Sequence, residues 1–192
     1  MPRNVEIKAW VVDPQGLEAR VAAIADSGPT PLVQDDTFFH CDNGRLKLRK
    51  FPDGTGELIF YRRPDHGGPK TSFYVISPTA SPDTLREALT LAHGETGRVV
   101  KQRTLYLVGR TRVHLDRVAG LGDLMELEVV LADGESEDDG VRDAQALMAR
   151  LGIGADRLVH GAYVDLLRRR TLPEATDEVP QAPVDFRPPS SS

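Results

Sequence analysis

Apolar and polar residues alternate along several segments of this chain, and the polar positions carry full charges. The segment Val5-Glu6-Ile7-Lys8 begins the pattern, and Arg45-Leu46-Lys47-Leu48-Arg49 repeats it. Strict alternation is typical of a β-strand with one buried face. Arg and Lys occupy the polar face of the middle segments, whereas Glu or Asp occupies that of the outer ones. This order of charges suggests a cavity that holds a polyanion together with a metal ion.

The pattern predicts eight strands and four helices. We expect the strands at residues 3–12, 33–40, 45–51, 57–63, 70–76, 97–108, 110–118 and 123–131. Asp13-Pro14 caps the first predicted helix, which stops at Gly28, and Ser81-Pro82 caps the second, which runs through Leu91. The last two helices are expected at residues 141–151 and 156–169.

Hairpin connections between most of these strands favour an α+β fold built on an antiparallel sheet. We predict an eight-stranded antiparallel β-barrel with helices packed outside it. The helices would cover the apolar side of each strand, and the charged side would line the bore. An open sheet with one charged face in water is the alternative. Charge on one parity in five strands favours the barrel.

Length and composition narrow the class of protein. The 192 residues fit one domain at residues 1–170 and a disordered tail at 171–192, which is rich in Pro, Ser and acidic residues. No apolar run is long enough to span a membrane, and no signal segment is present. The single Cys41 fits a reducing cytoplasm, and the net charge of -5 argues against nucleic-acid binding. We expect a cytoplasmic monomer or homodimer.

Carboxylates on two neighbouring strands form a candidate metal site. Glu126 and Glu128 lie two apart and point to one side, and Asp116 lies on the preceding strand across a tight turn. Glu6 would join them if the first strand closes beside the last. Mg²⁺ or Mn²⁺ prefers oxygen ligands of this kind. A single Glu-x-Glu pair more often belongs to a solvated face. The basic residues that face this pair are the reason to consider it a metal site.

Basic residues of the alternating segments are candidate phosphate ligands, because guanidinium groups bind phosphate oxygens in pairs and lysine supplies a compact charge. The candidates are Lys8, Arg45, Lys47, Arg49, Arg63, Lys70, Lys101, Arg103 and Arg112. His114 shares the parity of Arg112 and Asp116, so it either binds phosphate, orients Asp116 or has a structural role. Tyr61 and Tyr74 fit either bore-lining hydroxyls or packing in the wall.

An ordered set of these segments resembles the CYTH superfamily, the triphosphate tunnel metalloenzymes. Val5-Glu6-Ile7-Lys8 is similar to the family's Glu-x-Glu-x-Lys signature. The resemblance covers about residues 4–168 and continues through 34–39, 44–49, 57–65, 100–103, 114–118, 121–123, 126–128 and 161–167. It implies an eight-stranded antiparallel tunnel that acts on a small-molecule triphosphate with a divalent metal.

The resemblance also implies roles for individual residues. Glu6, Glu126 and Glu128 would bind the metal, with Asp116 near the metal and the reacting phosphate. Asp116, Lys101 and Arg63 are the expected catalytic residues. The expected phosphate-binding set is Lys8, Arg45, Lys47, Lys70, Lys101, Arg103, Arg112 and His114. Arg49 has the right parity but a looser match. Asn4 stands where the signature has its first Glu, which would weaken a second metal site.

The implied function is divalent-metal-dependent phosphohydrolysis of a nucleoside, thiamine or inorganic triphosphate. One alternative is a class IV adenylate cyclase, which makes cyclic AMP and pyrophosphate from ATP. A second alternative is a sensor that binds a nucleotide or polyphosphate without turnover, and Asn4 adds weight to it. The residues alone do not identify the substrate.

Overall fold

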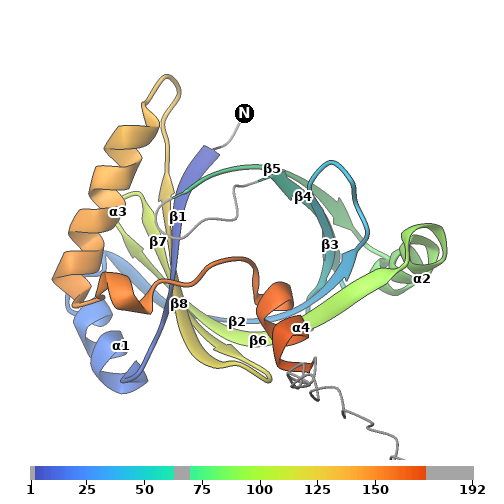
Figure 1. The fold of residues 1–192 in the computed structure, drawn as a ribbon, viewed down its shortest axis with the longest axis horizontal. Helices are drawn as coiled ribbons and strands as arrows, with labels where there is room; N and C mark the ends of the chain where they lie inside the picture. Colours follow the sequence, from blue (N-terminus) through green and yellow to red (C-terminus); the bar gives the residue numbers. More distant parts are fainter. Residues whose placement is uncertain (1–2, 63–69, 172–192) are drawn as a thin grey trace, which may run out of the picture.

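The structure is a computed structural model, and it describes residues 3–62 and 70–171. Eight strands form one sheet, and the helices lie outside it (Figure 1). The strands are β1 (Arg3–Trp10), β2 (Ser27–Phe39), β3 (Arg45–Lys50), β4 (Gly56–Arg62), β5 (Lys70–Thr79), β6 (Glu95–Val108), β7 (Thr111–Val118) and β8 (Gly122–Val130). The helices are α1 (Pro14–Ala22), α2 (Pro82–His93), α3 (Glu137–Leu151), the 3₁₀ turn η1 (Ala155–Arg157) and α4 (Tyr163–Thr171).

The sheet closes on itself in the order β1-β5-β4-β3-β2-β6-β7-β8. Every neighbouring pair is antiparallel, and β1 completes the ring by pairing with both β5 and β8. Figure 1 looks into this ring. The structure therefore confirms the predicted α+β fold with an eight-stranded antiparallel barrel.

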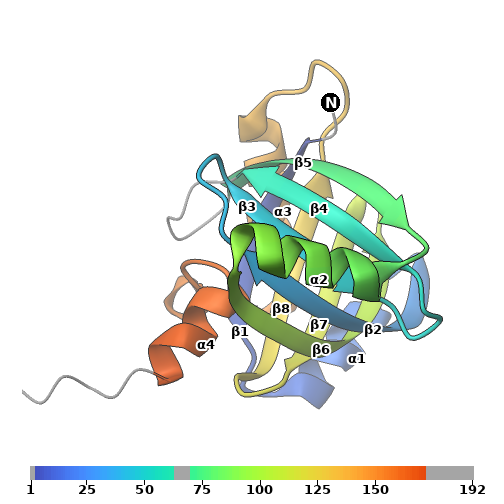
Figure 2. The same cartoon turned by 90° about the vertical axis from the view of Figure 1, so that its right-hand side faces the viewer.

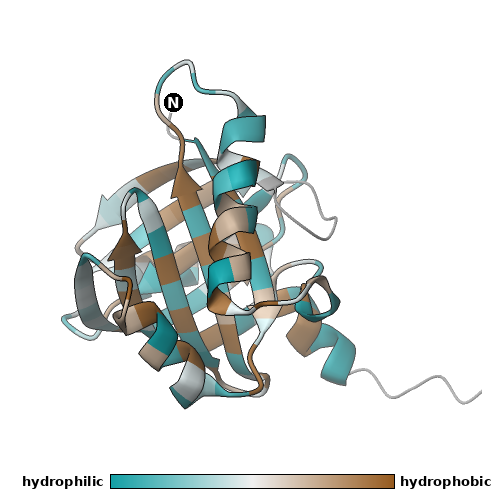
Figure 3. Ribbon diagram, turned by 90° about the vertical axis from the view of Figure 1, so that its left-hand side faces the viewer, coloured by the Kyte–Doolittle hydropathy of each residue, from teal (hydrophilic) through white to brown (hydrophobic). Residues whose placement is uncertain are grey.

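The main hydrophobic core lies outside the barrel, between the strands and two helices. Val5 and Ile7 of β1 pack there with Leu127 of β8, and Leu147 and Leu151 of α3 cover them. Along these strands, hydrophobic and hydrophilic residues form alternating bands beneath α1 and α3 (Figure 3). Since successive side chains of a strand point to opposite faces, burying these residues outside turns their charged neighbours inward.

A second core closes one end of the barrel. Val164 of α4 packs there with Phe38 of β2, Val99 of β6 and Leu124 of β8. α2 lies apart from the other helices, against β2 and β3 (Figure 2). No helix within the described ranges is long and apolar enough to cross a membrane.

One predicted helix end and one predicted strand start are wrong in the N-terminal half of the chain. The first helix ends at Ala22 instead of Gly28, because β2 already begins at Ser27 and the Asp26 amide donates to the Leu107 carbonyl. β2 is thus six residues longer at its start than the expected strand at 33–40. The remaining strands differ from the prediction by a few residues at their ends.

The last two predicted helices also need correction. α3 begins at Glu137 instead of residue 141, because the Ser136 hydroxyl caps it by accepting from the Asp139 amide. A continuous helix at 156–169 is wrong. Val159 donates its amide to the Lys8 carbonyl over 2.9 Å, so this stretch is extended beside β1. A helix starts again only after Gly161, whose φ of 86° ends the extended segment.

Candidate active site

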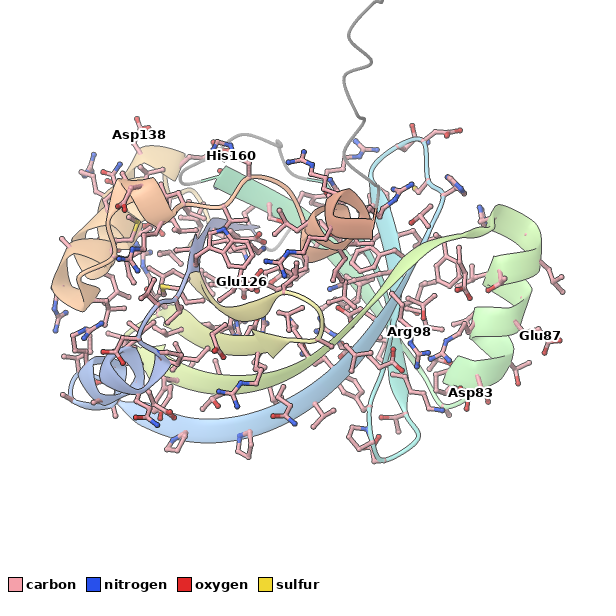
Figure 4. The ribbon with its side chains drawn as sticks, turned by 60° about the horizontal axis from the view of Figure 1, so that its bottom comes forward. Asp83, Glu87, Arg98, Glu126, Asp138 and His160 are labelled. Carbon is pink, nitrogen blue, oxygen red and sulfur yellow. The ribbon has the colours of Figure 1, made fainter. Side chains whose placement is uncertain are left out.

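A cavity of about 240 Å³ lies inside the barrel, and residues from every strand line it. Glu126 lies within the ring, whereas Asp83, Glu87 and Arg98 lie at or near α2 outside it (Figure 4). Among the described residues, six Lys or Arg and four Asp or Glu side chains line this cavity. They are Lys8, Lys47, Arg49, Lys101, Arg103, Arg112, Glu6, Asp36, Glu126 and Glu128. The cations are therefore mostly balanced by carboxylates.

Arg103 of β6 connects two buried carboxylates. Its Nε and Nη2 each lie 2.6 Å from the Asp116 carboxylate, and Nη2 also donates to Glu126. Lys8 forms an ion pair with Glu126, and Lys101 Nζ lies 3.0 Å from Asp116 Oδ2. The strand register explains this cluster, because Lys8 faces Glu126 on β8 and Arg103 faces Asp116 on β7.

These pairs decide the protonation of the cluster. Burial alone would raise the pKa values of Asp116 and Glu126. The charges of Arg103 and Lys101 outweigh burial at Asp116, and those of Lys8 and Arg103 do so at Glu126, so both pKa values lie below their ordinary range. Both groups are carboxylates at neutral pH.

Glu128 belongs to a second group on β7 and β8. His114 Nε2 and Arg112 Nη1 each lie 3.3 Å from its Oε2. Burial opposes ionisation, but the interaction with His114 lowers the pKa of Glu128 to about 2. Burial, followed by the charge of Arg103, lowers the pKa of His114, so the imidazole is neutral at physiological pH. Within the described residues neither imidazole nitrogen has a hydrogen-bond partner, so the contact with Glu128 is one of proximity.

A third group lies on β2 and β3. Asp36 accepts from Lys47 Nζ at 2.7 Å and from Arg49 through Nε at 2.7 Å and Nη2 at 2.9 Å. Burial and the neighbouring Arg49 lower the pKa of Lys47 to about 8 despite the attraction of Asp36. Lys47 is consequently a cavity cation that loses its charge above about pH 8, within the ordinary pH range of an enzyme assay.

The start of α4 reaches into the cavity. The Tyr163 hydroxyl donates to Asp116 Oδ2 over 2.9 Å. Its ring lies under Lys8 and Lys101, whose Nζ atoms are 4.4 and 4.9 Å from the ring centroid. Cations over an aromatic face are attracted by its quadrupole. Tyr163 therefore positions both lysines and the carboxylate between them.

The cavity also holds oxygen donors of the kind that suits a divalent metal. Glu6 and Glu128 face each other directly across β1 and β8, and both line the cavity. Asn4 Oδ1, on the same face of β1, is buried without a hydrogen-bond partner. Three hard oxygen ligands fit Mg²⁺ or Mn²⁺ by chemistry. Within residues 3–62 and 70–171, however, no three acidic, His or Cys side chains are grouped closely enough to hold a metal by themselves.

Most of the residues predicted from the sequence line the cavity. Arg45 is an exception, since its Nη2 lies 2.8 Å from Asp165 Oδ2 and it lines a separate cleft beside α4. Asp116 does not line the cavity, because its side chain is fully buried behind Arg103 and Tyr163. Arg63 and residues 172–192 lie outside the described residues, and the side chain of Lys70 is not described.

The sequence did not single out Asp36 or Tyr163 as functional residues. Asp36 shares its strand parity with Gln34 and Phe38, which also line the cavity, so the alternation offered a signal. Its neighbour Asp35 points outward and binds Arg98 over 2.5 Å. Tyr163 had no such signal, because it comes from a helix and its place depends on how α4 packs.

A family model and several solved structures are similar to this chain. The family model of the CYTH domain matches residues 2–163. No curated protein matches the sequence. The structure is similar to that of the PH1012 protein from Pyrococcus horikoshii, with a TM-score of 0.76, 19% identity and coverage of 85% of this chain and 99% of that one.

Two further similar structures have names that mention an activity. A candidate adenylate cyclase from Vibrio parahaemolyticus has a TM-score of 0.69 and 18% identity, covering 86% of this chain and 97% of that one. A candidate adenylyl cyclase from Hippeastrum, described as having a dominant triphosphatase activity, has a TM-score of 0.62 and 15% identity. That match covers 89% of this chain and 98% of that one. At these identities the likeness concerns the fold.

Proposed function

Because the chain belongs to the CYTH domain family, we propose that it is an enzyme that hydrolyses a triphosphate with a divalent metal ion. One observation carries this proposal. Six Lys or Arg side chains and four carboxylates from different strands line one cavity inside the closed barrel. A phosphate chain needs several cations around it, and a metal needs carboxylates close to those cations.

The cations are proposed to exchange protein carboxylates for phosphate oxygens when the substrate binds. Arg103 and Arg49 present guanidinium groups that can bind phosphate oxygens in pairs, whereas Lys8, Lys47 and Lys101 act as point charges. Their ion pairs hold them in place, so little rotamer freedom remains to be lost on binding.

In this proposed function, Asp116 is a positioning residue. Its carboxylate binds Arg103 and Lys101 but does not itself line the cavity. Glu6, Glu126, Glu128 and the carbonyl oxygen of Asn4 are the proposed metal ligands. Mg²⁺ or Mn²⁺ held there would supply Lewis-acid polarisation of a phosphoryl oxygen.

Two observations favour a second candidate, a sensor that binds a triphosphate without turning it over. Asn4 supplies a neutral oxygen where the family signature has a carboxylate. Glu126 and Glu128 already have basic partners, so a metal must compete with Lys8, Arg103 and Arg112 for them. Cyclisation of ATP is the other alternative within this family.

A substrate panel separates these functions. The purified protein is incubated with Mg²⁺ or Mn²⁺ and inorganic triphosphate, ATP, GTP or thiamine triphosphate, and phosphate, pyrophosphate and cyclic nucleotide are all quantified. Hydrolysis releases phosphate, and cyclisation releases equal amounts of pyrophosphate and cyclic AMP. Glu128→Gln should abolish most turnover, whereas Arg117→Gln, an exposed change on β7, should not. Binding by calorimetry without any product would establish the sensor and overturn the enzyme.

A further inference from the structure

One wall of the cavity is apolar instead of charged. On β4 and β5 the side chains that line the cavity include Ile59, Tyr61, Tyr74 and Ile76, which we call the apolar wall. The register places Ile59 directly opposite Ile76, and Tyr61 directly opposite Tyr74. Four side chains in two facing pairs form one continuous surface, because directly opposed residues of antiparallel strands are nearest neighbours.

Part of this wall is open to the cavity rather than packed. Ile76 keeps 45% of its surface exposed although it lines the cavity, whereas Ile59 is buried and Tyr61 packs against the second core. An apolar side chain facing water gains nothing from the hydrophobic effect, and a wall that met only phosphates would favour polar or basic residues. The wall therefore suits an apolar part of a ligand.

The apolar wall adjoins the groups that would hold the phosphates. Lys47 on β3 lies directly opposite Ile59, and its Nζ is 5.8 Å from the ring centroid of Tyr61. At the other side, Ser72 of β5 faces Asn4 of β1, two residues from Tyr74. A phosphate bound by Lys47 would thus place whatever is esterified to it against Ile59 and Ile76.

We propose that the apolar wall binds the organic group of a triphosphate ester, and that the substrate is an organic triphosphate with a flat aromatic ring system instead of inorganic triphosphate. The two tyrosines offer ring faces and edges for stacking, and the two isoleucines offer apolar contact. This inference rests on the proposed function of the same cavity and narrows its substrate class.

The test uses two neighbouring residues of β5. Ile76→Ser removes apolar contact from the wall, and Val75→Ser is the matched control, because Val75 is 52% exposed and has the opposite parity. With ATP and thiamine triphosphate, Ile76→Ser should lower kcat/KM about tenfold or more, as expected for losing several apolar carbons from a pocket. With inorganic triphosphate it should change kcat/KM less than about twofold, and Val75→Ser should leave all three unchanged.

Binding measurements make the outcome independent of turnover. Calorimetry is run with a non-hydrolysable β,γ-imido nucleoside triphosphate and with inorganic triphosphate on the wild type and both variants. If the wild type binds the nucleotide more tightly than inorganic triphosphate, and Ile76→Ser removes this difference, the result supports the apolar wall. If in addition no substrate is turned over, only the proposal that the protein is an enzyme fails. Equal use of inorganic triphosphate, or equal losses for all ligands in Ile76→Ser, would overturn the inference while leaving hydrolysis intact.

Discussion

Asp116 shows how a single buried carboxylate organises the candidate site. It accepts from Arg103, Lys101 and Tyr163, which come from β6 and α4. A buried charge of this kind is tolerated only because its partners are equally buried and geometrically fixed. Removing the charge leaves Arg103 and Lys101 to share the carboxylate of Glu126, so its effect should appear in stability before it appears in catalysis.

We expect Asp116→Asn to lower the free energy of unfolding by about 3–5 kcal/mol, measured in urea at neutral pH. The folded pKa of Asp116 lies below its ordinary value, so its contribution is complete above the unfolded pKa and declines as the pH falls. The difference between wild type and variant should therefore shrink on acidification. Arg117→Ala, which removes an exposed ion pair on the same strand, should change stability by less than about 1 kcal/mol.

Lys47 should impose an alkaline limit on substrate capture. Its pKa of about 8 means that the free protein loses this charge above that pH, and a neutral amine attracts phosphate weakly. The value of kcat/KM reports groups of the free enzyme, so it should fall above about pH 8 in the wild type. Lys47→Arg stays charged and should lack this decline.

Lys50→Arg is the control for this experiment, because Lys50 lies on the same strand with the opposite parity and binds Asp83 outside the barrel. It should keep the alkaline decline. An identical decline in Lys47→Arg would assign the pH dependence to another group.

At the scale of single elements, one acidic residue of α4 holds this helix against the barrel. Asp165 Oδ2 accepts the Ala162 amide over 3.0 Å at the start of the helix and also binds Arg45 of β3. A side chain that returns to the amide preceding its helix acts as half of a capping box. The same carboxylate thus starts α4 and fastens it to the sheet.

We expect Asp165→Ala to loosen α4 without unfolding the barrel. Amide hydrogen exchange in residues 163–167 should speed up about fivefold or more, which corresponds to about 1 kcal/mol of lost capping. Asp156→Ala, whose side chain is 80% exposed, serves as the control and should leave exchange unchanged. If exchange in α4 is equal in both variants, Asp165 does not hold the helix.

For the molecule as a whole, charged side chains line the interior of the barrel, and the main hydrophobic core lies outside it, between strands and helices. Leu127→Ala should therefore cost about 2–5 kcal/mol of unfolding free energy, because Leu127 is fully buried against α3 and leaves a cavity. Leu91→Ala, the same change at an exposed position of α2, should cost much less. Similar losses measured by urea denaturation would contradict this placement of the core.

The alternation of residues was sufficient to predict strands with one charged face, and its repetition favoured a barrel over an open sheet. Val5 and Ile7 need burial, and the period of a strand then turns Glu6 and Lys8 the other way, whatever the neighbours are. The same local reasoning placed Glu126 and Glu128 on one face. These features depend on residues one or two positions apart, so the sequence carries them directly.

Only the tertiary structure decided which charges meet. Arg45 and Lys47 share a strand face, but α4 supplies Asp165 to Arg45, whereas β2 supplies Asp36 to Lys47. In the same way, the extended stretch before α4 exists because Val159 finds a partner in β1. Such outcomes depend on groups as far apart in the sequence as Lys8 and Val159, whose meeting follows from strand order and helix packing. No local period in the sequence encodes that order, so partners and helix ends required the folded molecule.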